Sequence, residues 1–118
     1  MASTVQSRKA KGRRFQQWIC ELIRSSFGLE EDDVQSRSMG AGGEDIMLSP
    51  KARSLFPFSV EAKNQEKLNV WEAFKQAQSN SKDYIPILFI KRNRETPKVV
   101  LEAETFIKLL KNAKIENS

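Results

Sequence analysis

Three charged side chains in the middle of the sequence have the types and the spacing of a metal-dependent hydrolytic site. Asp45 stands at the start of a short apolar run, and Glu61 and Lys63 lie at the end of a second run, Phe58 to Lys63. Side chains alternate along a strand, so Glu61 and Lys63 point to the same face, roughly 7 Å apart along the chain. If the two runs pair as strands, Asp45 stands beside Glu61 on that face.

Two carboxylates and a lysine on one face are suited to the hydrolysis of a phosphate ester. Carboxylate oxygens are the ligands that Mg²⁺ prefers, and Mn²⁺ is a possible substitute. Such a metal polarises a phosphoryl oxygen and lowers the pKa of a bound water. The lysine orients that water or neutralises charge that builds up at the phosphate. The alternative is a charged strand end that faces solvent, because Asp followed by Glu-x-Lys often arises by chance.

The periodicity of the apolar residues predicts the elements that position these side chains. Helices are expected over residues 13–26, 70–81 and 103–112, and strands over 34–37, 44–48, 58–63, 85–91 and 98–101. This order, α-β-β-β-α-β-β-α, predicts a single α/β domain over residues 1–118 with a mixed central sheet flanked by helices. Residues 1–8 are expected to form a mobile tail.

Aromatic and aliphatic residues of the first helix predict its buried face. The i, i+3, i+4, i+7, i+8 spacing gives a buried stripe made of Phe15, Trp18, Ile19, Leu22 and Ile23. The second tryptophan, Trp71, is expected to lie in the core or in an interface rather than to stack on a base.

The composition favours a polyanionic partner and excludes several kinds of site. The 118 residues include 20 Lys and Arg against 15 Asp and Glu, a formal net charge of +5, which is typical of nucleic-acid-binding proteins. The chain contains no His, so His general bases and Ser-His-Asp triads are excluded. Its single cysteine, Cys20, excludes an internal disulfide and a multi-cysteine zinc site. Without a secretory or membrane-length apolar run, a cytoplasmic protein with no membrane partner is expected.

Clusters of basic residues near the start, the middle and the end of the chain are expected to position a nucleic-acid backbone rather than to read bases. They are Lys9, Lys11, Arg13, Arg14, Arg37, Lys51, Arg53, Lys91, Arg92 and Arg94. For the N-terminal cluster the alternative is a solvated tail.

A glycine-rich loop precedes Asp45. Gly40, Gly42 and Gly43 allow either a segment that closes on a phosphate or an ordinary flexible turn. The spacing is not Gly-x-x-x-x-Gly-Lys-Ser/Thr, so no nucleotide cofactor is expected.

Asp45, followed by Glu61-Ala62-Lys63 at the end of an aliphatic strand, resembles the PD-(D/E)XK nuclease signature. The wider pattern is similar to small archaeal-type Holliday junction resolvases and related phage endonucleases. The features that match in order, from about Lys9 to Leu110, are Lys11-Gly12-Arg13, the helix with Glu21, the Ser/Gly loop, the Glu-x-Lys strand and Gln76-Ala77. The family has a proline where this chain has Glu44; Asp45 is the expected ligand because Ile46 follows it, as in the family.

The resemblance implies a restriction-endonuclease-like core and a Mg²⁺-dependent endonuclease that cuts branched DNA, such as Holliday junctions, as a homodimer. A phage-encoded protein of this kind would act in the host cytoplasm. By resemblance, the metal is held by Asp45 and Glu61, helped by Glu21 and the carbonyl of Ala62. Lys63 positions or polarises the attacking water, and Gln76 supports Lys63 or that water. The segment at Ser38 lies near the DNA.

Other interpretations remain open. The chain could be a nonspecific or nicking nuclease for single strands or flaps, or a subunit that needs a partner for activity. It could also be a non-catalytic nucleic-acid-binding module. A binding module would explain the positive net charge of the chain. It would not explain Asp45 and Glu61, because carboxylates repel phosphate unless a cation lies between them. Glu21 could instead be an exposed partner of Arg14 or Arg24, and Gln76 a surface residue.

Overall fold

The computed structural model describes residues 4–37 and 42–113 of the chain, and these residues form an α/β domain. The elements, in chain order, are α1 (Val5–Phe27), η1 (Glu31–Asp33), β1 (Val34–Ser36), β2 (Ile46–Leu48), α2 (Pro50–Leu55), β3 (Phe58–Asn64), α3 (Val70–Asn80), β4 (Ile85–Lys91), β5 (Lys98–Val100) and α4 (Ala103–Asn112). The order of the major elements agrees with the sequence prediction, and the short helices η1 and α2 are additions to it.

The first helix begins eight residues earlier than predicted. Thr4 caps it, because its hydroxyl accepts a hydrogen bond from the backbone N–H of Ser7 and the Ser7 side chain accepts one from the N–H of Thr4. This reciprocal pair satisfies two of the free N–H groups of the first turn. The prediction of a mobile tail over residues 1–8 was therefore wrong for residues 4–8, while residues 1–3 lie outside the described ranges.

The buried face of α1 is rotated from the predicted stripe. Its buried residues are Phe15, Gln16, Ile19, Cys20 and Ile23. Trp18 and Leu22, which were expected to be buried, are 45% and 41% exposed. The face is centred on Ile19, so Trp18 lies at its edge.

The strands form a mixed sheet and a separate hairpin. β3 pairs with β4 in parallel and β4 pairs with β5 antiparallel, which confirms a mixed sheet. β1 and β2 pair antiparallel with each other. The hairpin reaches the open edge of β3 through the N–H of Asp45, which donates to the carbonyl of Val60 at 2.8 Å.

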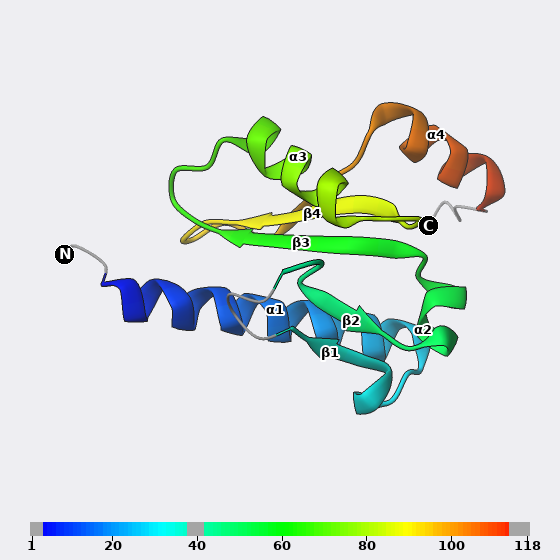
Figure 1. Cartoon of the computed structure of the whole chain (residues 1–118), viewed down its shortest axis with the longest axis horizontal. Helices are drawn as coiled ribbons and strands as arrows, with labels where there is room; N and C mark the ends of the chain where they lie inside the picture. The colour runs from blue at the N-terminus through cyan, green and yellow to red at the C-terminus, as the bar shows by residue number, and fades with distance from the viewer. Residues whose placement is uncertain (1–3, 38–41, 114–118) are drawn as a thin grey trace.

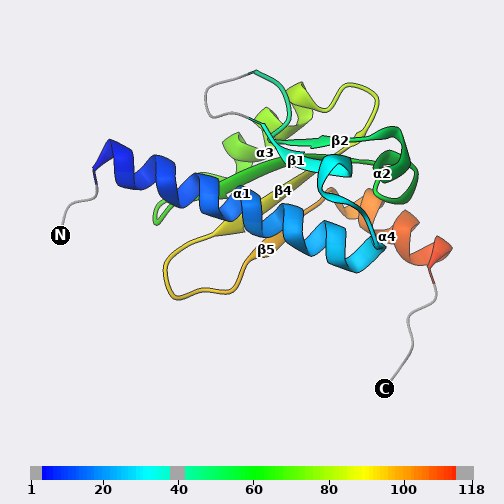
Figure 2. The same ribbon diagram turned by 90° about the horizontal axis from the view of Figure 1, so that it is seen from below.

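Helices cover both faces of the three-stranded sheet (Figure 1). α3 and α4 lie on one side of it, and α1, α2 and the β1–β2 hairpin lie on the other. Figure 2, seen from below, shows α1 running across the face of the sheet. The first helix therefore passes close to the strand that carries Glu61 and Lys63.

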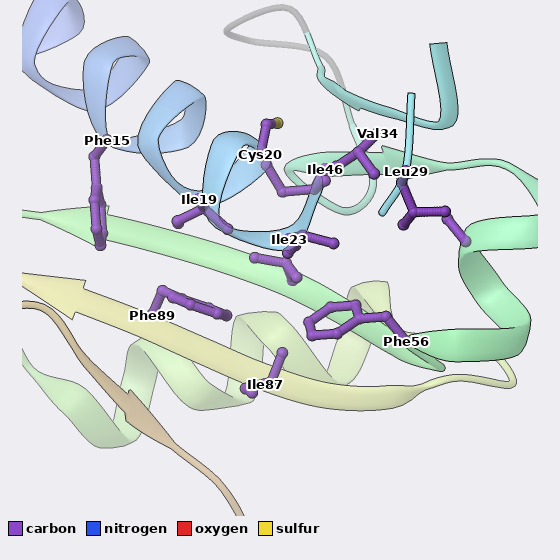
Figure 3. Packing of buried hydrophobic residues seen from close by; sticks show 12 residues of the cluster. Phe15, Ile19, Cys20, Ile23, Leu29, Val34, Ile46, Phe56, Ile87 and Phe89 are labelled. Atoms are coloured by element: carbon purple, nitrogen blue, oxygen red, sulfur yellow. The ribbon is translucent and has the colours of Figure 1, made fainter. Parts of the chain in front are cut away.

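The main core lies between α1, the hairpin and the sheet (Figure 3). Ile19 and Ile23 of α1 point toward the sheet, where Ile87 and Phe89 of β4 meet them. Ile19 is fully buried, and burying such a side chain contributes about 1.5–3 kcal/mol. This packing fixes α1 relative to β3, and therefore fixes the basic N-terminal part of α1 relative to the acids.

The opposite face is covered more thinly. α3 packs through the small residues Ala73 and Ala77, while Trp71 is 82% exposed. Trp71 therefore lies outside the core, and its alternative place in an interface stays a prediction. None of the helices in residues 4–37 and 42–113 has the length and apolar content to cross a bilayer.

Candidate functional site

The first component of the site is Asp45, which is fixed on the open edge of β3. Its backbone N–H donates to the carbonyl of Val60 at 2.8 Å, and its Oδ2 accepts from the N–H of Ala62 at 2.7 Å. The N–H and C=O of one strand residue point to the same side, so the carbonyl of Ala62 also points to this edge. Asp45 thus contacts the backbone of the residue before Glu61, Val60, and of the residue after it, Ala62.

The second component is Glu61, a carboxyl group that is only 3% exposed. Its Oε1 accepts a hydrogen bond from Nδ2 of Asn80 at 3.4 Å. Burial, a side-chain hydrogen bond with Asp45 and the negative charge of Asp45 raise the pKa of Glu61 to about 8. The charge of Lys63 and the hydrogen bond from Asn80 oppose that shift. Glu61 therefore keeps its proton at neutral pH unless a cation takes its place.

The third component is Lys63, which follows Glu61 by two residues in β3. Alternation along the strand puts both side chains on one face, and the charge of Lys63 acts on Glu61. The sequence prediction that Asp45, Glu61 and Lys63 come together is met by this geometry. The route differs from the prediction, because Asp45 approaches through the open edge of β3 rather than as part of a paired strand.

The neighbouring acid, Glu44, is engaged elsewhere. It forms an ion pair with Arg53, and both side chains are largely buried. Nη1 of Arg53 also donates to the carbonyl of Phe58 at 2.9 Å, and its guanidinium lies 4.0 Å from the ring centroid of Tyr84. Glu44 is therefore held in an internal ion pair, whereas Asp45 is the acid that lies beside Glu61. The guanidinium of Arg53 is used in these internal contacts, and its predicted contact with DNA stays a prediction.

A basic groove leads away from Lys63. It is a cavity of about 950 Å³ between the first three turns of α1 and the end of β3 with the segment that follows. Its one acidic lining residue among those described, Glu66, lies 3.5 Å from Lys11. The positively charged lining residues are Arg8, Lys9, Lys11, Arg14, Lys63 and Lys67. Such an excess of cations attracts a polyanion.

The other predicted DNA-binding residues divide into four groups. Lys91 and Arg92 line cavities next to the groove. Arg37 donates from Nε to the carbonyl of Glu44 at 2.7 Å, so it braces the loop before the site. Ser38 lies outside the described residues. The exposed residues that line none of the cavities described here are Arg13, Lys51 and Arg94.

Two residues that the resemblance assigns to the site lie away from it. Glu21 is 200° around the helix from Ile19; its side chain is 80% exposed and lies 3.9 Å from Arg24. The prediction that Glu21 helps to hold a metal is therefore not met by the geometry. Gln76 is exposed on α3, and the residue of α3 that reaches Glu61 is Asn80, one turn later.

Sequence reasoning missed several polar residues that line the site. Asn80 contacts Glu61, while Gln16, Asn64 and Lys67 line the groove. A signal existed for Gln16, because it lies three residues before Ile19, on the face that becomes buried. A polar residue at such a position is uncommon and calls for an explanation.

The donor set suits a divalent cation that prefers oxygen ligands, such as Mg²⁺. In the described part of the chain, no group of three or more His, Cys, Asp or Glu side chains could hold a metal. Mg²⁺ does not need such a group, because it binds through one or two carboxylates and keeps several waters. The pair of Asp45 and Glu61 with the carbonyl of Ala62 has the chemistry that this ion prefers.

Comparison of the chain with protein-family models, with curated proteins and with solved structures gave no match.

Proposed function

We propose that this chain is a Mg²⁺-dependent nuclease that hydrolyses phosphodiester bonds, with Mn²⁺ as a possible substitute. One observation carries the proposal: the carboxylate of Asp45 is held at the N–H of Ala62, beside the buried Glu61, and Lys63 lines the adjacent basic groove. Two carboxyl groups close together are unfavourable unless a proton or a cation compensates their charge. The groove attracts phosphate groups, and a cation held by this pair would meet the phosphates that the groove brings to it.

Asp45, Glu61 and the carbonyl of Ala62 would hold the ion. At neutral pH a proton on Glu61 compensates the negative charge of the Asp45–Glu61 pair. A bound cation would take the place of that proton. When bound, the ion supplies a polarised phosphoryl oxygen and a water of lowered pKa.

The other residues position these groups and the substrate. The N–H of Ala62 holds the carboxylate of Asp45, and the amide of Asn80 holds Glu61. The ammonium group of Lys63 orients the attacking water or stabilises charge that develops on the phosphate. The cations of the groove hold phosphates on either side of the scissile bond. Support of Lys63 by Gln76 remains a prediction of the resemblance.

DNA, and branched DNA in particular, is the substrate that the PD-(D/E)XK resemblance favours, together with a restriction-endonuclease-like core. Groove residues that bind the backbone suit recognition by shape rather than by base sequence. The alternatives are single-stranded or flap substrates, and a module that binds nucleic acid without cutting it. A binding module would bind equally well after Asp45→Asn in the absence of metal.

A homodimer is the remaining part of the proposal. α4 leaves two consecutive apolar residues, Phe106 and Ile107, about half exposed. Apolar residues exposed together are typical of an interface between subunits. Light scattering should give the mass of two chains for the wild type and of one chain for Ile107→Asp.

Metal binding by the isolated protein tests the proposed site directly. Titration with Mn²⁺, followed by calorimetry, should show binding by the wild type and at least about 10-fold weaker binding by Asp45→Asn. Glu72→Gln, an exposed acid on α3, is the matched control and should bind as the wild type does. Equal binding by all three proteins would contradict the proposed metal site.

A further inference from the structure

A second cavity lies beside the basic groove, on a face of α1 that carries two cations and two aromatic residues. Its volume is about 390 Å³. The facing side is contributed by the ends of β3 and β4 and by the β4–β5 connection, through Asn64, Lys91, Asn93 and Pro97. The helix residues that line it are spaced i, i+3, i+4 and i+7 on one face; they are Lys11, Arg14, Phe15 and Trp18.

Trp18 gives this cavity an aromatic surface. Its ring packs on that of Phe15, with centroids 6.1 Å apart and an interplanar angle of 27°. Phe15 is fixed in the core at 3% exposure, whereas Trp18 remains 45% exposed. The indole is therefore held in place by a buried ring and still available to a ligand. An exposed aromatic ring beside cations is the arrangement on which unpaired bases stack.

The polar groups of the cavity match the other parts of a nucleotide. Lys11, Arg14 and Lys91 supply positive charge, and no acidic residue lines this cavity in the described ranges. Oδ1 of Asn64 is buried and has no hydrogen-bond partner among the described residues. Cations bind phosphates, and amides pair with the edges of bases. A base stacked inside a duplex could not present its face to Trp18, so an unpaired nucleotide is the ligand that fits.

The cavity and the groove are continuous along α1. They share Lys11, Arg14, Asn64 and Asn93, and the groove extends from these residues to Lys63. A strand held in the groove therefore reaches Trp18 without leaving the protein surface. We infer that this cavity is a subsite for an unpaired nucleotide of the bound strand, with its base stacked on Trp18. The inference rests on the proposed function, because it assumes that the groove holds nucleic acid.

Tryptophan fluorescence tests the subsite without any need for cleavage. The chain has two tryptophans, and Trp71 lines neither cavity. In Trp71→Phe, the tryptophan fluorescence comes from Trp18 alone. An oligothymidylate of about 12 nucleotides, added in EDTA, should quench this fluorescence. In Trp18→Phe, Trp71 reports and should change little. A Trp18 signal that stays constant while the oligonucleotide is shown to bind would overturn the subsite.

Affinity provides the second readout. Trp18→Ala should bind oligothymidylate about 5- to 100-fold more weakly, while its affinity for a blunt duplex of equal length should not change. Trp71→Ala is the matched control and should bind both as the wild type does. An equal loss for duplex and single strand would show a general backbone contact and overturn the inference. If Trp18→Ala does not fold, the quenching in Trp71→Phe decides alone.

The outcomes separate this inference from the proposed function. Quenching of Trp18 without metal-dependent cleavage would support the subsite and contradict the nuclease. Cleavage without quenching would contradict the subsite alone, and absence of all binding to nucleic acid would contradict both.

Discussion

The carboxyl group of Asp45 raises the pKa of Glu61, although Asp45 precedes the second strand of the hairpin and Glu61 lies inside β3. This arrangement depends on the backbone N–H of Ala62, which holds the Asp45 carboxylate against the edge of β3. It also depends on the core between α1 and β3, which places the basic groove next to the pair. The chemistry proposed for this chain follows from that arrangement.

Asp45→Asn should abolish most of the activity while it preserves the fold. The amide oxygen of asparagine can still accept from the N–H of Ala62, but the ligand charge is lost. We expect cleavage with Mg²⁺ to fall by at least about 100-fold, with the same circular dichroism spectrum and thermal unfolding within a few degrees of the wild type. Activity within about twofold of the wild type would remove Asp45 from the mechanism.

The raised pKa of Glu61 predicts a pH dependence of stability in EDTA. Its carboxyl pKa rises from 4.5 to about 8 on folding, so between these values the folded state binds more protons than the unfolded state. The free energy of unfolding should therefore fall as pH rises from about 5 to 8. The decrease due to Glu61 is on the order of a few kcal/mol. Urea unfolding of the wild type and Glu61→Gln across this range measures it.

In Glu61→Gln the side chain no longer titrates, so the slope of stability against pH should be smaller than in the wild type. Equal slopes for the two proteins would mean that Glu61 is charged in the folded state and is not coupled to Asp45.

The sequence predicted the parts of this site that depend on local periodicity. Alternation along Phe58–Asn64 gave the shared face of Glu61 and Lys63. The order of strands and helices also followed from apolar patterns. The start of α1 was missed, because residues 1–8 were expected to form a mobile tail, although Thr4 and Ser7 form a capping box there.

The rest could not be predicted because it depends on tertiary contacts. No local pattern indicates that Asp45 meets β3 at its open edge, or that Asn80 rather than Gln76 faces Glu61. The buried stripe of α1 was misplaced for the same reason. Hydrophobicity favoured Trp18 as a buried residue, whereas packing against the sheet buried Gln16 instead.

Asn80 and Gln76 give a direct comparison between the structure and the family resemblance. Asn80 stabilises the charged form of Glu61, so Asn80→Ala should raise the pKa of Glu61 further. The rising limb of the pH–rate profile should move upward by about half to one unit, with several-fold slower cleavage at neutral pH. Gln76→Ala, on the same helix, should leave the profile unchanged. The opposite result would favour the role that the resemblance gives to Gln76.

Glu44 and Arg53 should affect stability rather than chemistry. Arg53→Ala leaves the buried carboxylate of Glu44 without its ion pair, which should cost about 3–5 kcal/mol of unfolding free energy. Glu44→Gln should cost less, since the amide can still accept from Arg53. Both variants, at temperatures where they are folded, should bind Mn²⁺ as the wild type does. Loss of Mn²⁺ binding in Glu44→Gln would show that Glu44, and not Asp45 alone, is a ligand.

The measurement that tests the central claim most directly is cleavage of labelled four-way junction, flap, single-stranded and linear duplex DNA, in Mg²⁺ or EDTA. Wild type and Lys63→Ala are compared, with Lys75→Ala, an exposed lysine of α3, as the matched control. We predict cutting by the wild type and by Lys75→Ala in Mg²⁺ only, and a loss of at least about 100-fold in Lys63→Ala. Cutting of the junction alone supports the preference for branched DNA. Absence of cutting in any combination, or equal cutting by Lys63→Ala, would contradict the proposed function.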